Sequence, residues 1–185
     1  LLDGLEGDAR AEALARRGAL ALWRGRWAEA LRDLTPAAEA GAVFALGWRG
    51  AALTKLGRRR EGIAELEKYI ALRPDDAECR VWLAEALRAD GRAARAREVL
   101  DEAFKLGRAH LFAQLNHALA RLELGEDAAA REELRLVAVN WPAAYARFFK
   151  KGVAPADAAR RWLEAARGVR RSEPYLSMLW NHGRA

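Results

Sequence analysis

The chain has 185 residues, of which 52% are hydrophobic and 31% charged, a balance typical of a soluble helical protein. Its single cysteine, Cys79, excludes an intrachain disulfide and with it the disulfide-rich class of small secreted proteins. The longer apolar runs, such as residues 41–48, fall well short of the roughly eighteen residues that a membrane span needs. We therefore expect no membrane-spanning segment.

The net charge of +6 is unevenly distributed. Nine of the 32 basic residues and three of the 26 acidic residues lie in 145–185, so this segment carries the whole excess and residues 1–144 are neutral. Arginine greatly outnumbers lysine and alanine is abundant, which indicates a GC-rich bacterial genome. The chain begins at Leu1 rather than at methionine. We read it as a trimmed piece of a bacterial, cytoplasmic protein, before which a leader peptide would be invisible.

Four glycines follow the ends of apolar helical stretches at a nearly fixed spacing. They are separated by 32, 34 and 34 residues: Gly25, Gly57, Gly91 and Gly125. A glycine readily adopts positive φ and so suits the turn between two helices. Pro74 and Pro142 lie seventeen residues after Gly57 and Gly125, where a second helix would end. The period predicts an array of helix pairs rather than one compact core.

Other positions recur in register with these glycines. Small residues stand seven before them (Gly18, Gly50, Ala84, Ala118) and five after them (Ala30, Gly62, Ala96, Ala130), where two helices must approach closely. Leucines stand nine after them (Leu34, Leu66, Leu100, Leu134), and Ala37, Tyr69, Ala103 and Val137 stand twelve after. Apolar residues at helical spacing lie between these positions.

This register resembles that of the tetratricopeptide repeat (TPR) family over roughly residues 11–144, as four helix pairs. The resemblance implies an all-α, right-handed α-solenoid of antiparallel pairs. The sequence departs from the family at Leu46 and Arg80, where tryptophan is favoured; Trp48 and Trp82 lie two residues later. The first repeat is also two residues shorter than the others, so we expect an irregular junction between the first and second repeats.

In this family the first helix of each pair lines a concave groove that binds peptides or helices of partners. The resemblance places these residues on that wall: Arg16, Trp23, Phe44, Trp48, Lys55, Glu78, Trp82, Arg88, Phe112 and Asn116. Trp48 and Trp82 are 34 residues apart, and Lys55 and Arg88 have nearly the same spacing. In one interpretation the two tryptophans anchor a partner in the groove and the two cations form a basic rim beside them. The other interpretation makes both tryptophans displaced versions of the family's packing aromatic.

The dicarboxylate clamp of chaperone-binding TPR proteins is not visible in the sequence. That clamp needs lysine and asparagine on successive turns of the first helices, and the corresponding places hold Gly47, Ala51, Val81 and Glu85. Asn116 alone does not rebuild it. Chaperone C-termini are therefore not the expected partners.

No residue pattern predicts catalysis. His110 and His117 are seven residues apart, about 10 Å along a helix, too far to share one zinc ion. His117 falls at a packing position, in the core or the groove, and Cys79 has no context as a nucleophile. The acidic pairs 75–76, 101–102 and 132–133 fit helix starts or outer faces. We expect a protein without catalytic residues, metal or cofactor.

The pattern changes after Pro142, and residues 145–185 are predicted to form a basic helical cap. We expect helices over 143–151, 156–167 and 173–181, with apolar residues covering the last repeat. Seven of the nine basic residues of this segment would make up one basic surface: Lys150, Lys151, Arg160, Arg161, Arg167, Arg170 and Arg171. They form either a solvated face or a contact surface for phosphate groups or an acidic protein.

Three functions remain open from the sequence. The first is a non-catalytic scaffold or adaptor that binds a peptide or helix of another protein in its groove. The second is a self-associating scaffold or spacer within a larger protein. The third is regulatory nucleic-acid binding through the basic segment, although the sequence contains no recognition-helix signature.

Overall fold

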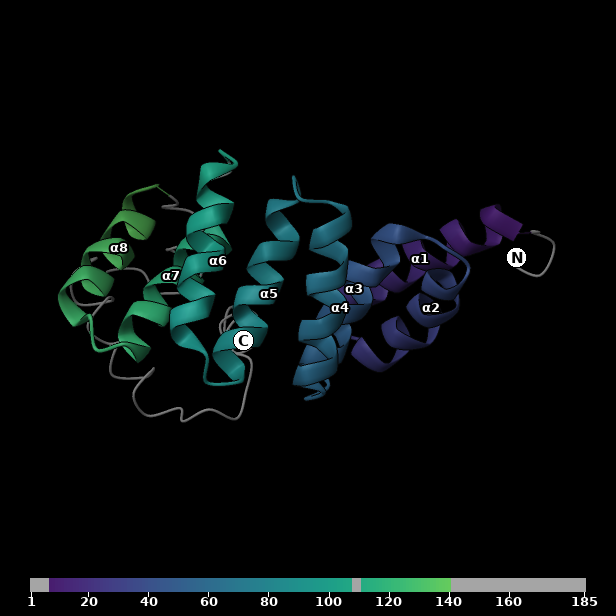
Figure 1. The fold of residues 1–185 in the computed structure, drawn as a ribbon, viewed down its shortest axis with the longest axis horizontal. Coiled ribbons are helices and arrows are strands. Elements are labelled where there is room, and N and C mark those ends of the chain that lie inside the picture. The colour runs from purple at the N-terminus through teal and green to yellow at the C-terminus, as the bar shows by residue number, and fades with distance from the viewer. Residues whose placement is uncertain (1–6, 108–110, 141–185) are drawn as a thin grey trace. The chain divides into compact units, whose positions relative to one another are not determined.

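The computed structural model describes residues 7–107 and 111–140, and in these ranges it has eight α-helices and no strand. Within each of the two units described below, the helices run antiparallel to their neighbours in sequence (Figure 1). Their bounds are α1 Gly7–Trp23, α2 Trp27–Glu39, α3 Val43–Lys55, α4 Arg59–Leu72, α5 Ala77–Ala89, α6 Ala93–Lys105, α7 Leu111–Glu123 and α8 Asp127–Asn140. The predicted all-α class and the four helix pairs are confirmed.

Two compact units divide the chain, one spanning Leu1–Ala86 and the other beginning at Leu87, so the boundary falls within α5. In the first unit α1 packs on α2, α2 on α3 and α3 on α4. In the second unit α6 packs on α7 and α7 on α8. The predicted division into repeats at 1–144 and a cap at 145–185 stays a prediction.

The four recurring glycines form one repeated turn. Their φ angles are 75°, 82°, 80° and 80° at Gly25, Gly57, Gly91 and Gly125. At each turn the next N–H donates to a carbonyl five residues back, as from Arg26 to Ala21 at 2.9 Å. This is the Schellman closure, which needs a left-handed residue and therefore favours glycine. The prediction that glycine separates the helices of each pair is confirmed.

The small positions permit close helix crossings. A Cβ built on Gly18 would lie 2.6 Å from Leu34 Cγ, and one on Gly50 would lie 2.7 Å from Leu66 Cγ. Leu34 and Leu66 are themselves fully buried. The small residue before the turn and the leucine after it thus form one packing unit, in which the leucine side chain occupies the space that a Cβ would take.

The first repeat is two residues shorter than the second because its second helix and the turn after that helix are each one residue shorter. Helix α2 has 13 residues and α4 has 14. The turn from α2 to α3 has three residues, with Gly41 at φ 92°, whereas the turn from α4 to α5 has four, 73–76. The predicted irregular junction between the first and second repeats is therefore a tighter turn after α2. Pro74 follows the end of α4 as expected, and Pro142 lies outside the described residues.

Asp76 closes the turn between α4 and α5. Its Oδ1 accepts from the Cys79 N–H at 3.0 Å as an N-cap, and its Oδ2 accepts from the Tyr69 hydroxyl at 2.8 Å. Burial, followed by this hydrogen bond, raises the pKa of Tyr69 above its usual value. Arg80, at a position where the TPR register favours tryptophan, is buried and donates to the Asp76 carbonyl at 3.1 Å.

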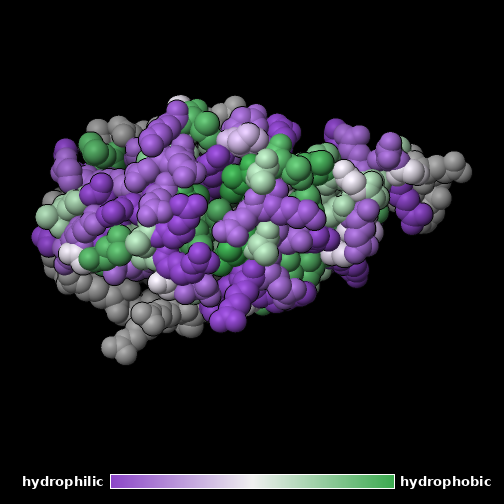
Figure 2. All heavy atoms as spheres, viewed as in Figure 1, coloured by the Kyte–Doolittle hydropathy of each residue, from purple (hydrophilic) through white to green (hydrophobic). Residues whose placement is uncertain are grey.

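Hydrophilic residues cover much of the face drawn in Figure 2, with hydrophobic residues reaching the surface in patches between them. The large exposed apolar side chains include Leu20 and Trp23, at 49% and 52%. The three helices predicted over 143–151, 156–167 and 173–181 and the seven basic residues from Lys150 to Arg171 lie outside the described residues.

Candidate functional site

Aromatic side chains from α1, α3 and α5 gather on the first unit. We call Trp23, Phe44, Trp48 and Trp82 the tryptophan face. The rings of Trp23 and Trp82 meet edge to face with centroids 6.0 Å apart, and those of Phe44 and Trp48 do so at 5.3 Å. Such geometry is the favoured arrangement of aromatic pairs. Trp23 and Trp82, far apart in sequence, are thereby brought together from α1 and α5, whereas Phe44 and Trp48 are one helical turn apart on α3.

Trp48 and Trp82 pack on the core without being enclosed by it, and their place in a binding groove stays a prediction. Each is half-buried and packs against the core cluster that includes Leu22, Leu34 and Ala52. Trp23 instead leaves 52% of its surface exposed. The first two tryptophans therefore support the core with one side, while Trp23 supplies the exposed apolar area.

Lys55 and Glu85 form an ion pair beside Trp82. The side chains are 7% and 6% exposed, and Lys55 Nζ also lies 5.4 Å from the centroid of the Trp82 ring. A cation at this distance is attracted by the electron-rich ring face. The pair links α3 to α5 and fixes the position of Trp82.

The expected basic rim is wrong, because both of its cations are paired. Lys55 is neutralised by Glu85, and Arg88 has a side chain only 8% exposed that donates to Asn116 Oδ1 at 2.8 Å and Glu123 at 2.7 Å. Asn116 is fully buried and donates to the Phe112 carbonyl at 3.0 Å. Asn116 is thus part of the core of the second unit and does not line a surface.

The remaining predicted groove residues are distributed between the two units. Arg16 is exposed on α1 and pairs with Glu12 at 2.5 Å, one helical turn earlier. Glu78 is exposed in the first turn of α5. Phe112 is half-buried and lies in the second unit. Asn116 and Arg88, which contact each other, lie in that unit too. Arg16, Trp23, Phe44, Trp48, Lys55, Glu78 and Trp82 lie in the first unit.

Sequence reasoning missed two residues of this region. Leu20 is 49% exposed and lies four residues after Arg16 and three before Trp23, on the same stripe of α1. Glu85 lies three residues after Trp82 on α5. In the sequence it stands out only as a residue that occupies a position of the dicarboxylate clamp without fitting it. Helical spacing from the predicted groove residues identifies both positions, but only the tertiary structure identifies Glu85 as the partner of Lys55.

Cys79 is not placed as a nucleophile. It is 4% exposed, and burial, with Asp76 and Glu78 nearby, raises the pKa of its thiol above the usual value. A buried thiol held in its protonated form is chemically inert.

Iodoacetamide is therefore expected to label Cys79 at least about a hundredfold more slowly in the native protein than in urea. The reason is that the thiol must first be exposed by opening of the α4–α5 region. Labelling followed by mass spectrometry measures the two rates. Equal rates would show that Cys79 is accessible in the folded protein.

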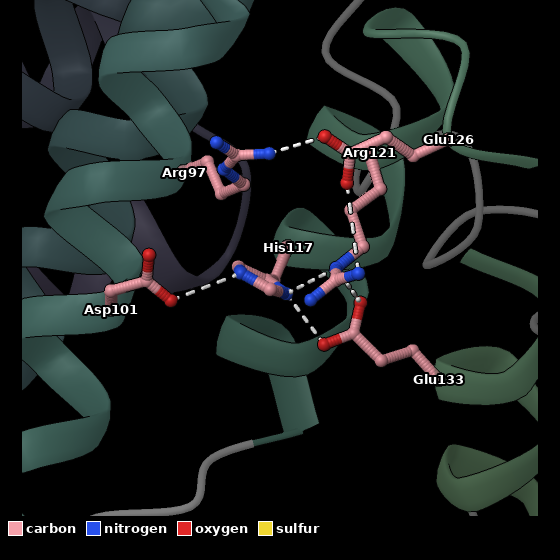
Figure 3. Close-up of polar contacts among 6 residues, drawn as sticks. All are labelled: Arg97, Asp101, His117, Arg121, Glu126 and Glu133. Atoms are coloured by element: carbon pink, nitrogen blue, oxygen red, sulfur yellow. Dashed lines mark hydrogen bonds and ion pairs between the residues drawn. The ribbon is translucent and has the colours of Figure 1, made fainter. Parts of the chain in front are cut away.

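A polar network joins three helices of the second unit (Figure 3). His117 on α7 is 3% exposed, with Nδ1 2.5 Å from Glu133 of α8 and Nε2 3.3 Å from Asp101 of α6. Arg121 Nε lies 3.4 Å from Glu133, and Arg97 pairs with Glu126. His117 thus lies in the core, one of the two predicted places. The assignment of Glu133 to an outer face is wrong, because it turns inward to His117.

Replacing His117 by leucine is expected to destabilise the second unit by about 1–3 kcal/mol, because the inward carboxylate of Glu133 loses one of its two partners and keeps only Arg121. His117→Gln keeps a donor and is expected to lose less. Urea unfolding followed by circular dichroism measures both. A His117→Leu variant as stable as the wild type would show that the contacts of His117 contribute nothing to stability.

Residues 7–107 and 111–140 lack two further features. No group of three or more histidine, cysteine or acidic side chains there is placed to hold a metal ion. Of the helices α1–α8, none combines the length and the hydropathy required to cross a membrane.

Comparison with known proteins gives one family. The tetratricopeptide repeat family model matches residues 53–122. A thermophilic TPR protein of Thermus thermophilus shares the fold at a TM-score of 0.66 and 20% identity, over 86% of this chain and all of that one. A TPR protein of Parabacteroides merdae matches at 0.66 and 16%, over 86% of this chain but only 59% of its own length. No curated protein matches the sequence.

These matches agree with the repeated glycine turn and the small-to-leucine packing described above. The solved structures confirm the predicted class, a TPR-like solenoid of helix pairs. Proteins of this fold are generally non-catalytic scaffolds for protein interactions. Residues 53–122 thus resemble the tetratricopeptide repeat family in sequence, and the chain shares the fold of solved TPR proteins.

Proposed function

We propose that the protein is a non-catalytic adaptor whose tryptophan face binds a peptide or helix of a partner protein. The observation that carries this proposal is Trp23, a large aromatic residue left 52% exposed while its ring packs edge to face with that of Trp82. Leu20, exposed beside it on α1, extends the apolar area. Exposed aromatic anchors of this kind are enriched at the centres of protein interfaces.

Affinity capture from a bacterial lysate tests the proposal with wild type and Trp23→Ala. Because Trp23 is largely exposed, its truncation leaves the core cluster intact, which is not true of the half-buried Trp48 and Trp82. A partner retained by the wild type and lost by a Trp23→Ala variant of unchanged helicity is the expected result. Leu136→Ala is a matched control, since Leu136 is 38% exposed on α8 in the second unit.

A different result would favour a self-associating scaffold. In that case the mass of the wild type in light scattering would rise with concentration, and the Trp23→Ala variant would stay monomeric without any captured partner. Partners captured equally by wild type and Trp23→Ala would contradict the tryptophan face as the binding surface.

A further inference from the structure

The charges around the tryptophan face are almost all matched within the protein. Its three helical stripes run through Arg16, Leu20 and Trp23 on α1, through Phe44, Trp48 and Lys55 on α3, and through Glu78, Trp82 and Glu85 on α5. Residues three, four or seven apart lie on one side of a helix. These stripes contain two cations. Arg16 pairs with Glu12, and Lys55 pairs with Glu85.

The two cations differ in how firmly they are held. Lys55 is buried with Glu85 and lies against Trp82, so removing it from its partner would leave a charge out of water. Arg16 is 74% exposed, and its pair with Glu12 is a weak surface pair. Any acidic ligand drawn to Arg16 would have to compete with the Glu12 carboxylate beside it.

Glu78 is the unmatched charge of this surface. It is exposed, and it forms no ion pair or hydrogen bond with another residue in the described ranges. It lies one helical turn before Trp82, on the same side of α5. The first turn of a helix favours a carboxylate, but this interaction leaves both oxygens open to solvent and to a ligand.

We propose that the tryptophan face selects a segment in which an arginine or lysine stands next to an apolar side chain. This inference rests on the proposed function and adds the chemistry of the partner. The apolar side chain would cover Leu20 and Trp23, both about half exposed. The cation would pair with Glu78 beside the indole of Trp82, where ring and carboxylate attract the same charge. An acidic segment would meet Glu78 and find no unpaired cation.

Selection from a displayed library of random peptides tests this on the full chain. We expect the selected peptides to carry arginine or lysine beside an apolar residue. Their binding should weaken about tenfold or more in Glu78→Lys, which reverses the local charge, and less in Glu78→Gln. It should weaken similarly in Trp23→Ala. Glu67→Lys is the matched control, since Glu67 is exposed on α4 and its replacement makes the same change in net charge.

Three results would contradict the proposal in distinguishable ways. Selected peptides that are acidic or uncharged but depend on Trp23 would overturn the charge preference and leave the proposed function standing. Basic peptides that bind Glu67→Lys as weakly as Glu78→Lys would show that the preference depends only on the overall charge of the protein. This result would again leave the proposed function standing. A selection that yields no Trp23-dependent peptide would overturn both proposals.

Discussion

Replacing Glu85 by alanine is expected to destabilise the first unit by about 3–5 kcal/mol. The Lys55 side chain is 7% exposed, and without Glu85 its ammonium group would remain buried and uncompensated. The position of Trp82 depends on the same cation, so the tryptophan face would be disturbed as well. Urea unfolding followed by far-UV circular dichroism measures the loss.

Two comparisons separate the lost pair from other causes. The double variant Lys55→Met, Glu85→Leu replaces both charges by apolar groups of similar size and is expected to lie within about 1–2 kcal/mol of the wild type, since buried pairs are often replaceable in this way. Glu61→Ala breaks the exposed pair with Arg58 and is expected to have no measurable effect. If Glu85→Ala behaved like Glu61→Ala, the pair would be hydrated in solution rather than buried.

Replacing Leu66 by alanine is expected to cost about 2–5 kcal/mol, because its fully buried side chain fills the crossing of α3 and α4 at Gly50. Gly50→Ala alone is expected to cost about 1–3 kcal/mol, since the new Cβ would lie 2.7 Å from Leu66 Cγ. Chemical denaturation gives both values.

The double variant Gly50→Ala, Leu66→Ala tests whether the two positions form one packing unit. Removal of Leu66 Cγ relieves the closest contact of the new Cβ, although Gly62 O at 3.0 Å still limits the space. The double variant should therefore lose less than the sum of the single losses, by about 0.5–3 kcal/mol. Gly57→Ala is a useful contrast: it meets no atom within 4 Å and is strained only by its φ of 82°. Strict additivity would contradict the coupling.

The helix pairs could be predicted because their determinants are local and repeated. Gly25, Gly57, Gly91 and Gly125 mark turns that need positive φ, and the leucines nine residues later mark the packing partner of the small position. The same pattern recurs four times, so an error at one repeat, such as the short first one, does not obscure the others.

The groove residues were only partly predictable. Their position on first helices follows from helical spacing and was assigned from the family register. Their exposure and pairing depend on which side chains another helix brings near, and this placed Asn116 in the core and Lys55 in an ion pair. Glu133 was assigned outward for the same reason: the spacing of α8 contains no information about His117 on α7.

The sequence by itself determined the period, the turns, the helix pairs and the all-α class, because these depend on backbone preferences and on contacts about sixteen residues apart within one repeat. Only the tertiary structure decided the charge of the tryptophan face. Glu85 neutralises Lys55 from thirty residues away, and Trp23 of α1 meets Trp82 of α5, with α2, α3 and α4 between them in the sequence. Whether a charged side chain is free for a ligand depends on partners brought close in space, which local spacing does not specify.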